Sequence, residues 1–150
     1  MIKRIILFAI LNFGALAIGG LFTPSGLSSD WYLTLSKAPW TPPGWVFGFA
    51  WTFIMICLTI YMAIALKNKN GLLTKFYIVQ LILNIIWTPT FFYFHYMTLS
   101  FVFIILLTSL IATMSIYFNK HNNCKSILLY PYLIWLCIAT SLNWYTVFYN

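Results

Sequence analysis

Charge is what this sequence has least of. Its 150 residues hold eight lysines and arginines but a single acid, Asp30. Charged residues make up 6% of the chain, against about 25% in ordinary soluble domains. One carboxylate excludes catalysis by paired acids, and no Ser-His-Asp set accompanies it. A phosphate-binding P-loop and a dinucleotide-binding glycine fingerprint are absent as well. The sequence therefore contains no conventional catalytic constellation.

Metal ligands are also scarce. Cys57, Cys124 and Cys137 have no C-x-x-C spacing, which argues against a disulfide framework and against a metal site. His95 and His121 each stand near a predicted helix end, without cysteines or acids beside them in the sequence. We expect no bound metal and no required cofactor.

Apolar residues dominate instead, at 63% of the chain with a mean hydropathy of +0.92. A helix needs about 20 apolar residues to cross the hydrocarbon core of a bilayer. Runs of that length predict five helices, at 4–23, 44–66, 72–94, 98–119 and 126–148. We therefore predict an all-α membrane protein, a single domain over 1–150, in which a long ordered loop at 24–43 separates the first two helices. The first run continues to Phe22, which is too long for a typical cleaved signal peptide.

The bases lie between the apolar runs. Lys3 and Arg4 precede the first helix, Lys67, Lys69 and Lys75 flank the second connection, and Lys120 and Lys125 flank the fourth. In a five-span bundle these all share one side, and Lys37 lies opposite with Asp30. The positive-inside rule then predicts a cytoplasmic N-terminus, with loop 24–43 and the C-terminus outside. Scattered bases do not indicate nucleic-acid binding. The short later connections predict that consecutive helices are antiparallel neighbours.

Aromatic residues and prolines concentrate at 31–51. This stretch holds Trp31, Trp40, Trp45 and Trp51, together with Pro39, Pro42 and Pro43. Prolines fix φ and stiffen a loop, and indoles offer flat apolar faces with one polar atom each. Two interpretations stay open: a rigid aromatic cover over a flat apolar ligand, or an aromatic belt at the membrane interface.

The predicted spans contain amides but no deep ionisable residue, which weighs against a proton relay or an ion channel. Helical spacing places three sets of residues on common faces. They are Gly44, Gly48, Trp51, Met55 and Leu58 on the second helix, Gln80, Asn84, Trp87 and Phe91 on the third, and Trp135, Ala139, Leu142 and Asn143 on the fifth. The amides serve either as hydrogen bonds between helices, worth about 1 kcal/mol each, or as ligand contacts.

Small residues form two pairs at helical spacing, Ala15 with Gly19 and Gly44 with Gly48. Such pairs allow close helix approach in lipid, within one bundle or in a homodimer, and both alternatives stay open. The sequence has no internal repeat that would support an inverted-repeat transporter.

Ordered motifs recur along nearly the whole chain. They read Trp31-Tyr32-x-x-Leu35-x-Lys37, Trp40-x-Pro42-Pro43, Phe49-x-Trp51, Gln80-Leu81-x-Leu83-Asn84-x-x-Trp87 and Pro131-Tyr132-x-x-Trp135-x-x-x-Ala139-x-x-Leu142-Asn143. In these motifs the chain resembles the translocator protein family, also called tryptophan-rich sensory proteins and formerly the peripheral benzodiazepine receptor. It departs at Lys37-Ala38-Pro39-Trp40, where the family more often has Lys-Pro-x-Trp.

The resemblance implies a five-helix bundle whose pocket is closed by the first loop. It implies binding of tetrapyrroles such as protoporphyrin IX, and of isoquinoline carboxamide- or benzodiazepine-like apolar ligands. The ligand-binding candidates are Tyr32, Trp40, Pro42, Gly48, Trp51, Met55, Gln80, Asn84, Trp87, Phe91, Trp135, Ala139, Leu142 and Asn143. For some bacterial members it also implies light-dependent porphyrin breakdown, for which the oxidisable indoles of Trp51 and Trp135 are candidates. A porphyrin transporter and a purely structural membrane protein are the alternatives.

Vertebrate members of the family also bind cholesterol at the end of the last helix. The general cholesterol pattern requires a base after its tyrosine. Here Leu142 and Tyr145 are followed by Val147-Phe148-Tyr149-Asn150 without a base, so we do not expect cholesterol binding. The short C-terminus and the Ile/Lys/Asn/Phe-rich composition indicate a bacterial member, and therefore the plasma membrane.

Overall fold

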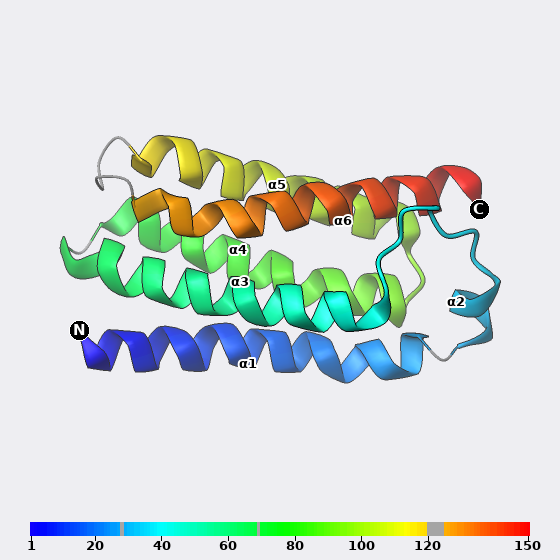
Figure 1. Cartoon of the computed structure of the whole chain (residues 1–150), viewed down its shortest axis with the longest axis horizontal. Coiled ribbons are helices and arrows are strands. Elements are labelled where there is room, and N and C mark those ends of the chain that lie inside the picture. Colours follow the sequence, from blue (N-terminus) through cyan, green and yellow to red (C-terminus); the bar gives the residue numbers. More distant parts are fainter. Residues whose placement is uncertain (28, 69, 120–124) are drawn as a thin grey trace.

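Five long helices dominate the computed structural model, which describes residues 1–27, 29–68, 70–119 and 125–150. The long helices are α1 (Ile2–Leu27), α3 (Gly44–Ala65), α4 (Gly71–Phe92), α5 (Met97–Asn119) and α6 (Tyr130–Tyr149). Short elements add α2 (Asp30–Thr34) and the 3-10 turns η1 (Leu66–Asn68) and η2 (Lys125–Leu129). Each long helix contains a segment long and apolar enough to cross a membrane. The described part of the chain thus confirms an all-α protein with five spans, drawn side by side in Figure 1.

The order of packing differs in one place from the prediction that consecutive helices are neighbours. α4 packs against α5 and α5 against α6, as expected. α3 and α4 are joined by a short connection, yet α1 packs against both of them, and they do not pack closely on each other. Large aromatic side chains and a cavity lie between these two helices. The rings of Trp51, Trp87 and Tyr132 stand between α3 and α4, with centroids of Trp51 and Trp87 6.4 Å apart.

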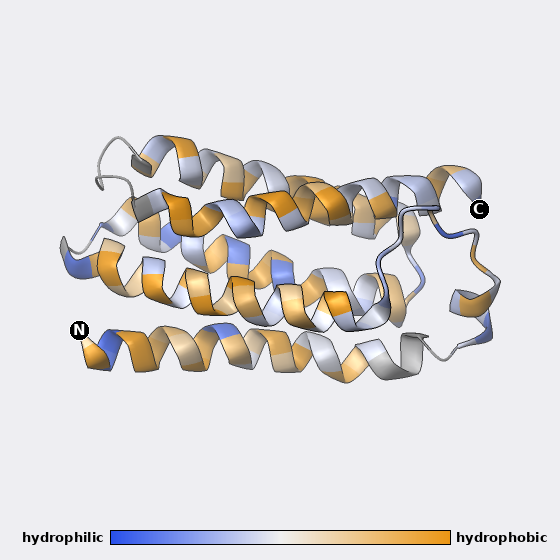
Figure 2. Cartoon of the chain, viewed as in Figure 1, coloured by the Kyte–Doolittle hydropathy of each residue, from blue (hydrophilic) through white to orange (hydrophobic). Residues whose placement is uncertain are grey.

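The two ends of the bundle carry different connections. The N-terminus and the α3–α4 connection lie at one end, and the α1–α3 connection, the α4–α5 turn and the C-terminus lie at the other (Figure 1). Lys3, Arg4 and Lys67 belong to the first end and Lys37 to the second, whereas Lys69 and Lys120 fall outside the described residues. Figure 2 shows hydrophobic residues along all the long helices between these ends. The predicted separation of bases is therefore present, and its orientation in the membrane stays a prediction.

Helix ends shift from their predicted positions for local reasons. α1 continues to Leu27, so residues 24–27 are helical and not part of the loop. At the start of α4, the side chain of Asn70 accepts hydrogen bonds from the backbone N–H groups of Leu72 and Leu73, at 3.0 and 3.1 Å, which is an N-cap. α6 begins at Tyr130 and not at 126, after the 3-10 turn η2. Pro131 thus lies in the first helical turn, where a missing N–H costs nothing.

A buried amide joins three helices near the middle of the bundle. Asn12 of α1 donates from Nδ2 to Thr59 Oγ1 of α3 at 2.9 Å, and Tyr77 of α4 donates from Oη to Asn12 Oδ1 at 2.8 Å. Asn12 is fully buried, so each bond satisfies a group that water cannot reach. These contacts hold α1 against α3 and α4 at about 1 kcal/mol each.

The two pairs of small residues behave differently. A side chain built on Gly19 would meet Thr88 Oγ1 at 3.2 Å, so α1 approaches α4 closely there. At Gly44 and Gly48 no heavy atom lies within 4 Å of the position of a Cβ, so this pair does not serve close packing inside the bundle. Both glycines border a cavity instead. A homodimer stays a prediction.

Candidate functional site

A cavity of about 600 Å³ opens between α1, α3 and α4 at the end of the bundle that carries the α1–α3 connection. Its walls are mostly apolar, with aromatic rings and several glycines. The lining residues are Ala15, Leu16, Gly19, Gly20, Thr23, Tyr32, Lys37, Thr41, Pro42, Gly44, Phe47, Gly48, Trp51, Thr52, Asn84, Trp87, Thr88 and Phe92. The predicted residues Tyr32, Pro42, Gly48, Trp51, Asn84 and Trp87 are among them.

Glycines create much of this space. Gly44 and Gly48 of α3 and Gly20 of α1 each leave the volume beside their Cα open. α1 forms a whole wall of the cavity, which sequence analysis missed because it treated the small residues of this helix only as packing positions. The adjacent Gly19-Gly20 pair is the sequence signal for this wall. Glycines destabilise a helix, so two in a row indicate a close neighbour or an open space beside the helix.

The inner end of the cavity is polar and already hydrogen-bonded. Asn84 donates from Nδ2 to Tyr132 Oη at 2.8 Å, and Tyr132 donates in turn to Gln80 Oε1 at 3.2 Å. Tyr132 is 1% exposed and joins α6 to α4 through both bonds. Asn84 also lines the cavity, whereas Gln80 does not. Asn84 therefore joins two helices by a hydrogen bond and also lines the cavity, and its contact with a ligand stays a prediction.

Two indoles form the aromatic wall. Trp51 of α3 lies 6.4 Å from Trp87 of α4, measured between ring centroids, and packs edge-on against Tyr132 at 6.0 Å. The Nε1 atom of Trp87 is buried and has no hydrogen-bond acceptor among the described residues. A buried donor without an acceptor carries a desolvation cost of about 1–3 kcal/mol.

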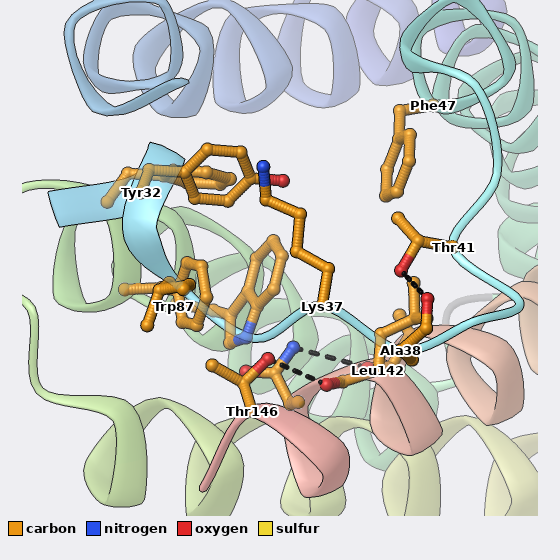
Figure 3. Close-up of a pocket in the computed structure, with 13 residues that line it drawn as sticks. Tyr32, Lys37, Ala38, Thr41, Phe47, Trp87, Leu142 and Thr146 are labelled. Atoms are coloured by element: carbon orange, nitrogen blue, oxygen red, sulfur yellow. Dashed lines mark hydrogen bonds between the residues drawn. The ribbon is translucent and has the colours of Figure 1, made fainter. Parts of the chain in front are cut away.

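A smaller cavity, of about 60 Å³, adjoins the first and reaches toward α6 (Figure 3). It shares Tyr32, Lys37, Thr41, Phe47, Trp87 and Phe92 with the large one. The remaining lining residues are Leu35, Ala38, Phe91, Ala139, Leu142, Asn143 and Thr146. The predicted residues Phe91, Ala139, Leu142 and Asn143 thus lie beside this smaller space.

Four of the candidate residues line neither cavity: Trp40, Met55, Gln80 and Trp135. Met55 is buried in the core at 1% exposure. Trp135 is 6% exposed and packs edge-on against Phe47, with ring centroids 5.3 Å apart. Phe47 lines both cavities and so covers Trp135 from that side. Ala139, Leu142 and Asn143 of the predicted α6 face line the smaller cavity, whereas Phe47 of α3 lies between the cavities and Trp135.

The segment 29–43, here called the cover, is held by hydrogen bonds and aromatic contacts. Ser36 donates from its backbone N to Asn150 Oδ1 at 2.8 Å and accepts from Asn150 Nδ2 at 3.2 Å. Trp40, half exposed, donates from Nε1 to Ser141 Oγ at 3.1 Å. Trp31 stacks on His95 in the α4–α5 turn, with centroids 4.1 Å apart. The cover is therefore an ordered element fastened to α6 and to the α4–α5 turn.

Lys37 and Tyr32 bring the cover to the mouth of both cavities. The Lys37 ammonium lies 4.3 Å from the centre of the Tyr32 ring, a cation–π contact. Burial raises the pKa of the Tyr32 phenol, so this group stays neutral at physiological pH. Among the described residues, no group of histidines, cysteines and acids could hold a metal ion. His121 and Cys124 lie outside those residues.

Comparison with known proteins agrees with this architecture. The chain is 33% identical over 151 residues to the tryptophan-rich protein TspO of Chlorobaculum tepidum, covering 95% of each chain. It is 33% identical to the tryptophan-rich sensory protein of Cereibacter sphaeroides, over 83% of this chain and 77% of that one. It is 32% identical to the human translocator protein, over 76% and 71%. Residues 5–149 match the profile of the TspO/MBR family. This multi-pass membrane protein therefore belongs to the TspO/MBR family.

Proposed function

We propose that the protein binds flat apolar ligands of the tetrapyrrole class, such as protoporphyrin IX, in the large cavity beneath the cover. The observation that carries the proposal is the cavity itself. Its volume of about 600 Å³ falls within the range of about 300–1,000 Å³ typical of small-molecule sites. Isoquinoline carboxamide- and benzodiazepine-like ligands, which are also flat and apolar, would occupy the same space.

Two kinds of contact support this choice of ligand. The faces of Trp51 and Trp87 give a wide aromatic wall on which a planar ring system can stack. Asn84, Thr52 and Thr88 give a few polar groups that can orient the ligand. A mostly apolar cavity with a few placed polar groups is the usual composition of a small-molecule site.

Binding, in a sensory role, is favoured over coupled transport. Among the residues that line the cavity, the charged side chain is Lys37, which belongs to the cover and not to a membrane-spanning helix. Coupled transport depends on ionisable groups within the membrane, whereas binding needs none. A passive carrier would also need none and is the alternative.

Light-dependent breakdown of bound porphyrin is a second candidate function, supported by one contact. Trp51 lines the large cavity, so its oxidisable indole would touch a bound porphyrin. On illumination, the excited porphyrin would accept one electron from the Trp51 indole and pass it to dioxygen, which is the terminal oxidant and is reduced to superoxide. Trp135 packs against the side of Phe47 that faces away from the cavities, so we propose that it supports Phe47 and does not touch the ligand.

We also infer that the cavity opens on the outer face of a bacterial plasma membrane. The bases of the N-terminal end favour the cytoplasm, and the opposite end carries the cover. A ligand would then arrive from outside or from the outer leaflet.

Filling the cavity tests the site. No heavy atom lies within 4 Å of a Cβ at Gly48, so the leucine side chain of Gly48→Leu can enter the cavity without a clash at its Cβ. We expect protoporphyrin IX, followed by quenching of tryptophan fluorescence, to bind at least about tenfold more weakly, as expected when overpacking costs about 1–3 kcal/mol. Gly14→Leu is the matched control, because Gly14 also has open space but lines neither cavity. Equal affinity in Gly48→Leu and wild type would contradict the proposed site.

A further inference from the structure

Lys37 is the one charged residue that lines either cavity. The other lining residues are apolar, aromatic, hydroxyl or amide side chains or glycines. The chain has a single acid, Asp30, and no ion pair to Lys37 is formed among the described residues. An apolar space therefore carries one positive charge, and no ion pair formed by the described residues balances it.

The position of this charge is fixed by a neighbour. The Lys37 ammonium stands 4.3 Å from the centre of the Tyr32 ring, and Tyr32 lines both cavities. In Figure 3 the Lys37 stem crosses the pocket and its amine ends beside Tyr32. The aromatic contact holds the ammonium over the mouth while leaving its N–H donors available, because a ring face does not saturate three donors.

The residues that line the two cavities differ in their capacity to donate and accept hydrogen bonds. Lys37 offers three N–H donors, whereas each hydroxyl and amide group of the lining carries an acceptor as well as a donor. The Lys37 ammonium therefore favours an electron-rich partner. Charge-assisted hydrogen bonds to a carboxylate are about twice as strong as neutral ones, so an acid would gain most from this mouth.

We propose that Lys37 binds a carboxylate of the ligand, so that the cavity selects flat apolar acids over their neutral esters. The apolar body lies between α1, α3 and α4, and the carboxylate stays at the mouth against the Lys37 ammonium. This inference rests on the proposed function, since it uses the same cavity, and it adds the charge of the ligand as the determinant of specificity.

The test compares protoporphyrin IX with its dimethyl ester, which has the same ring but no ionised carboxylate. Binding of each is measured in a non-ionic detergent, with wild type, Lys37→Met, Lys37→Arg and Lys75→Met. Lys37→Met keeps most of the side-chain length and removes the charge. Lys75 lies near the start of α4, at the end of the bundle away from the cavities. Lys75→Met therefore removes one positive charge there and controls for the net charge of the protein.

Wild type and Lys75→Met should bind the acid more tightly than the ester. Lys37→Met should lose about three- to tenfold of its affinity for the acid, keep its affinity for the ester, and so abolish the preference. Lys37→Arg should retain it. The preference should also shrink as salt is raised, because the ammonium is partly exposed to water.

Two outcomes overturn the inference. If Lys37→Met leaves the ratio of acid to ester affinity unchanged, Lys37 serves another anion, such as a lipid phosphate. If wild type binds acid and ester equally, charge does not contribute. Both leave the proposed function standing, because porphyrin still binds. If neither compound binds to wild type, while the protein remains folded by circular dichroism, the proposed function itself is contradicted.

Discussion

The ring of Phe47 lies edge-on against the indole of Trp135, with centroids 5.3 Å apart and planes inclined at 83°. Phe47 faces both cavities, and Trp135 faces neither. The two tryptophans that could take part in photochemistry therefore have different environments. Trp51 would touch the ligand, whereas Trp135 would be separated from it by a benzene ring.

This difference leads to the first prediction. Trp51→Phe should bind protoporphyrin IX within a few-fold of wild type, because phenylalanine keeps an aromatic face, yet it should lose most light-dependent product, because benzene is far harder to oxidise than indole. Trp135→Phe should keep both. The measurement is the absorbance spectrum of bound porphyrin during illumination in air and under nitrogen. Wild-type product formation in Trp51→Phe would exclude electron donation by this indole.

A second prediction separates ligand contact from helix joining at the inner end of the cavity. Asn84→Ala removes a side chain that lines the cavity and bonds to Tyr132, so both thermal stability and ligand affinity should fall, each by about 0.5–1.5 kcal/mol. Tyr132→Phe removes only the buried hydroxyl, so stability should fall by about 1–3 kcal/mol with affinity nearly unchanged. Thermal unfolding and fluorescence titration of both variants check this. Unchanged affinity in Asn84→Ala would make Asn84 a purely structural residue.

The fastening of the cover gives a third prediction. Asn150→Ala removes both hydrogen bonds to Ser36, which are exposed and contribute little to global stability. We expect bound porphyrin to dissociate about three- to tenfold faster with little change in melting temperature, because each bond contributes about 0.5–1.5 kcal/mol to the closed cover. Stopped-flow displacement by a competing ligand measures this rate. Ser109→Ala, on the exposed part of α5 and away from the cover, is a suitable control. An unaltered dissociation rate would mean that the other contacts hold the cover alone.

The fourth prediction concerns orientation in the membrane. Ser36→Cys in the cover and Lys67→Cys in η1 place a thiol at opposite ends of the bundle. A membrane-impermeant maleimide applied to intact cells should label residue 36 and spare residue 67 until the cells are opened. Labelling in the reverse order would invert the topology and place the cavity mouth on the cytoplasmic side.

The helices were predictable from sequence because span length depends only on the run of apolar residues and the thickness of the bilayer. The start of α3 agrees with its prediction at residue 44, while α6 begins four residues late because Pro131 belongs in a first turn. Helical spacing also placed Gly48 with Trp51 on one face of α3, and Asn84 with Trp87 on one face of α4. All four residues line the large cavity.

Other parts of the site depended on contacts between distant segments, which helical spacing does not contain. Trp135 lies on the predicted face of α6, but Phe47 of α3 takes the position beside the cavity. The bond from Ser36 to Asn150 joins residues 114 apart in the chain. The wall formed by α1 follows from the packing of this helix against both α3 and α4, which its own sequence does not specify.

The cavity occupies only one end of the bundle, and this has a consequence for motion. Around the other end, Tyr61, Met62, Leu73, Ile111 and Phe118 are at most 1% exposed, so that half is densely packed. Amide hydrogen exchange should therefore be slow around Tyr61, Leu73 and Ile111 and fast around Gly19, Gly48 and Trp87. The packed half acts as a fixed foundation, and the open half can adapt to ligands of different outline without unfolding the molecule.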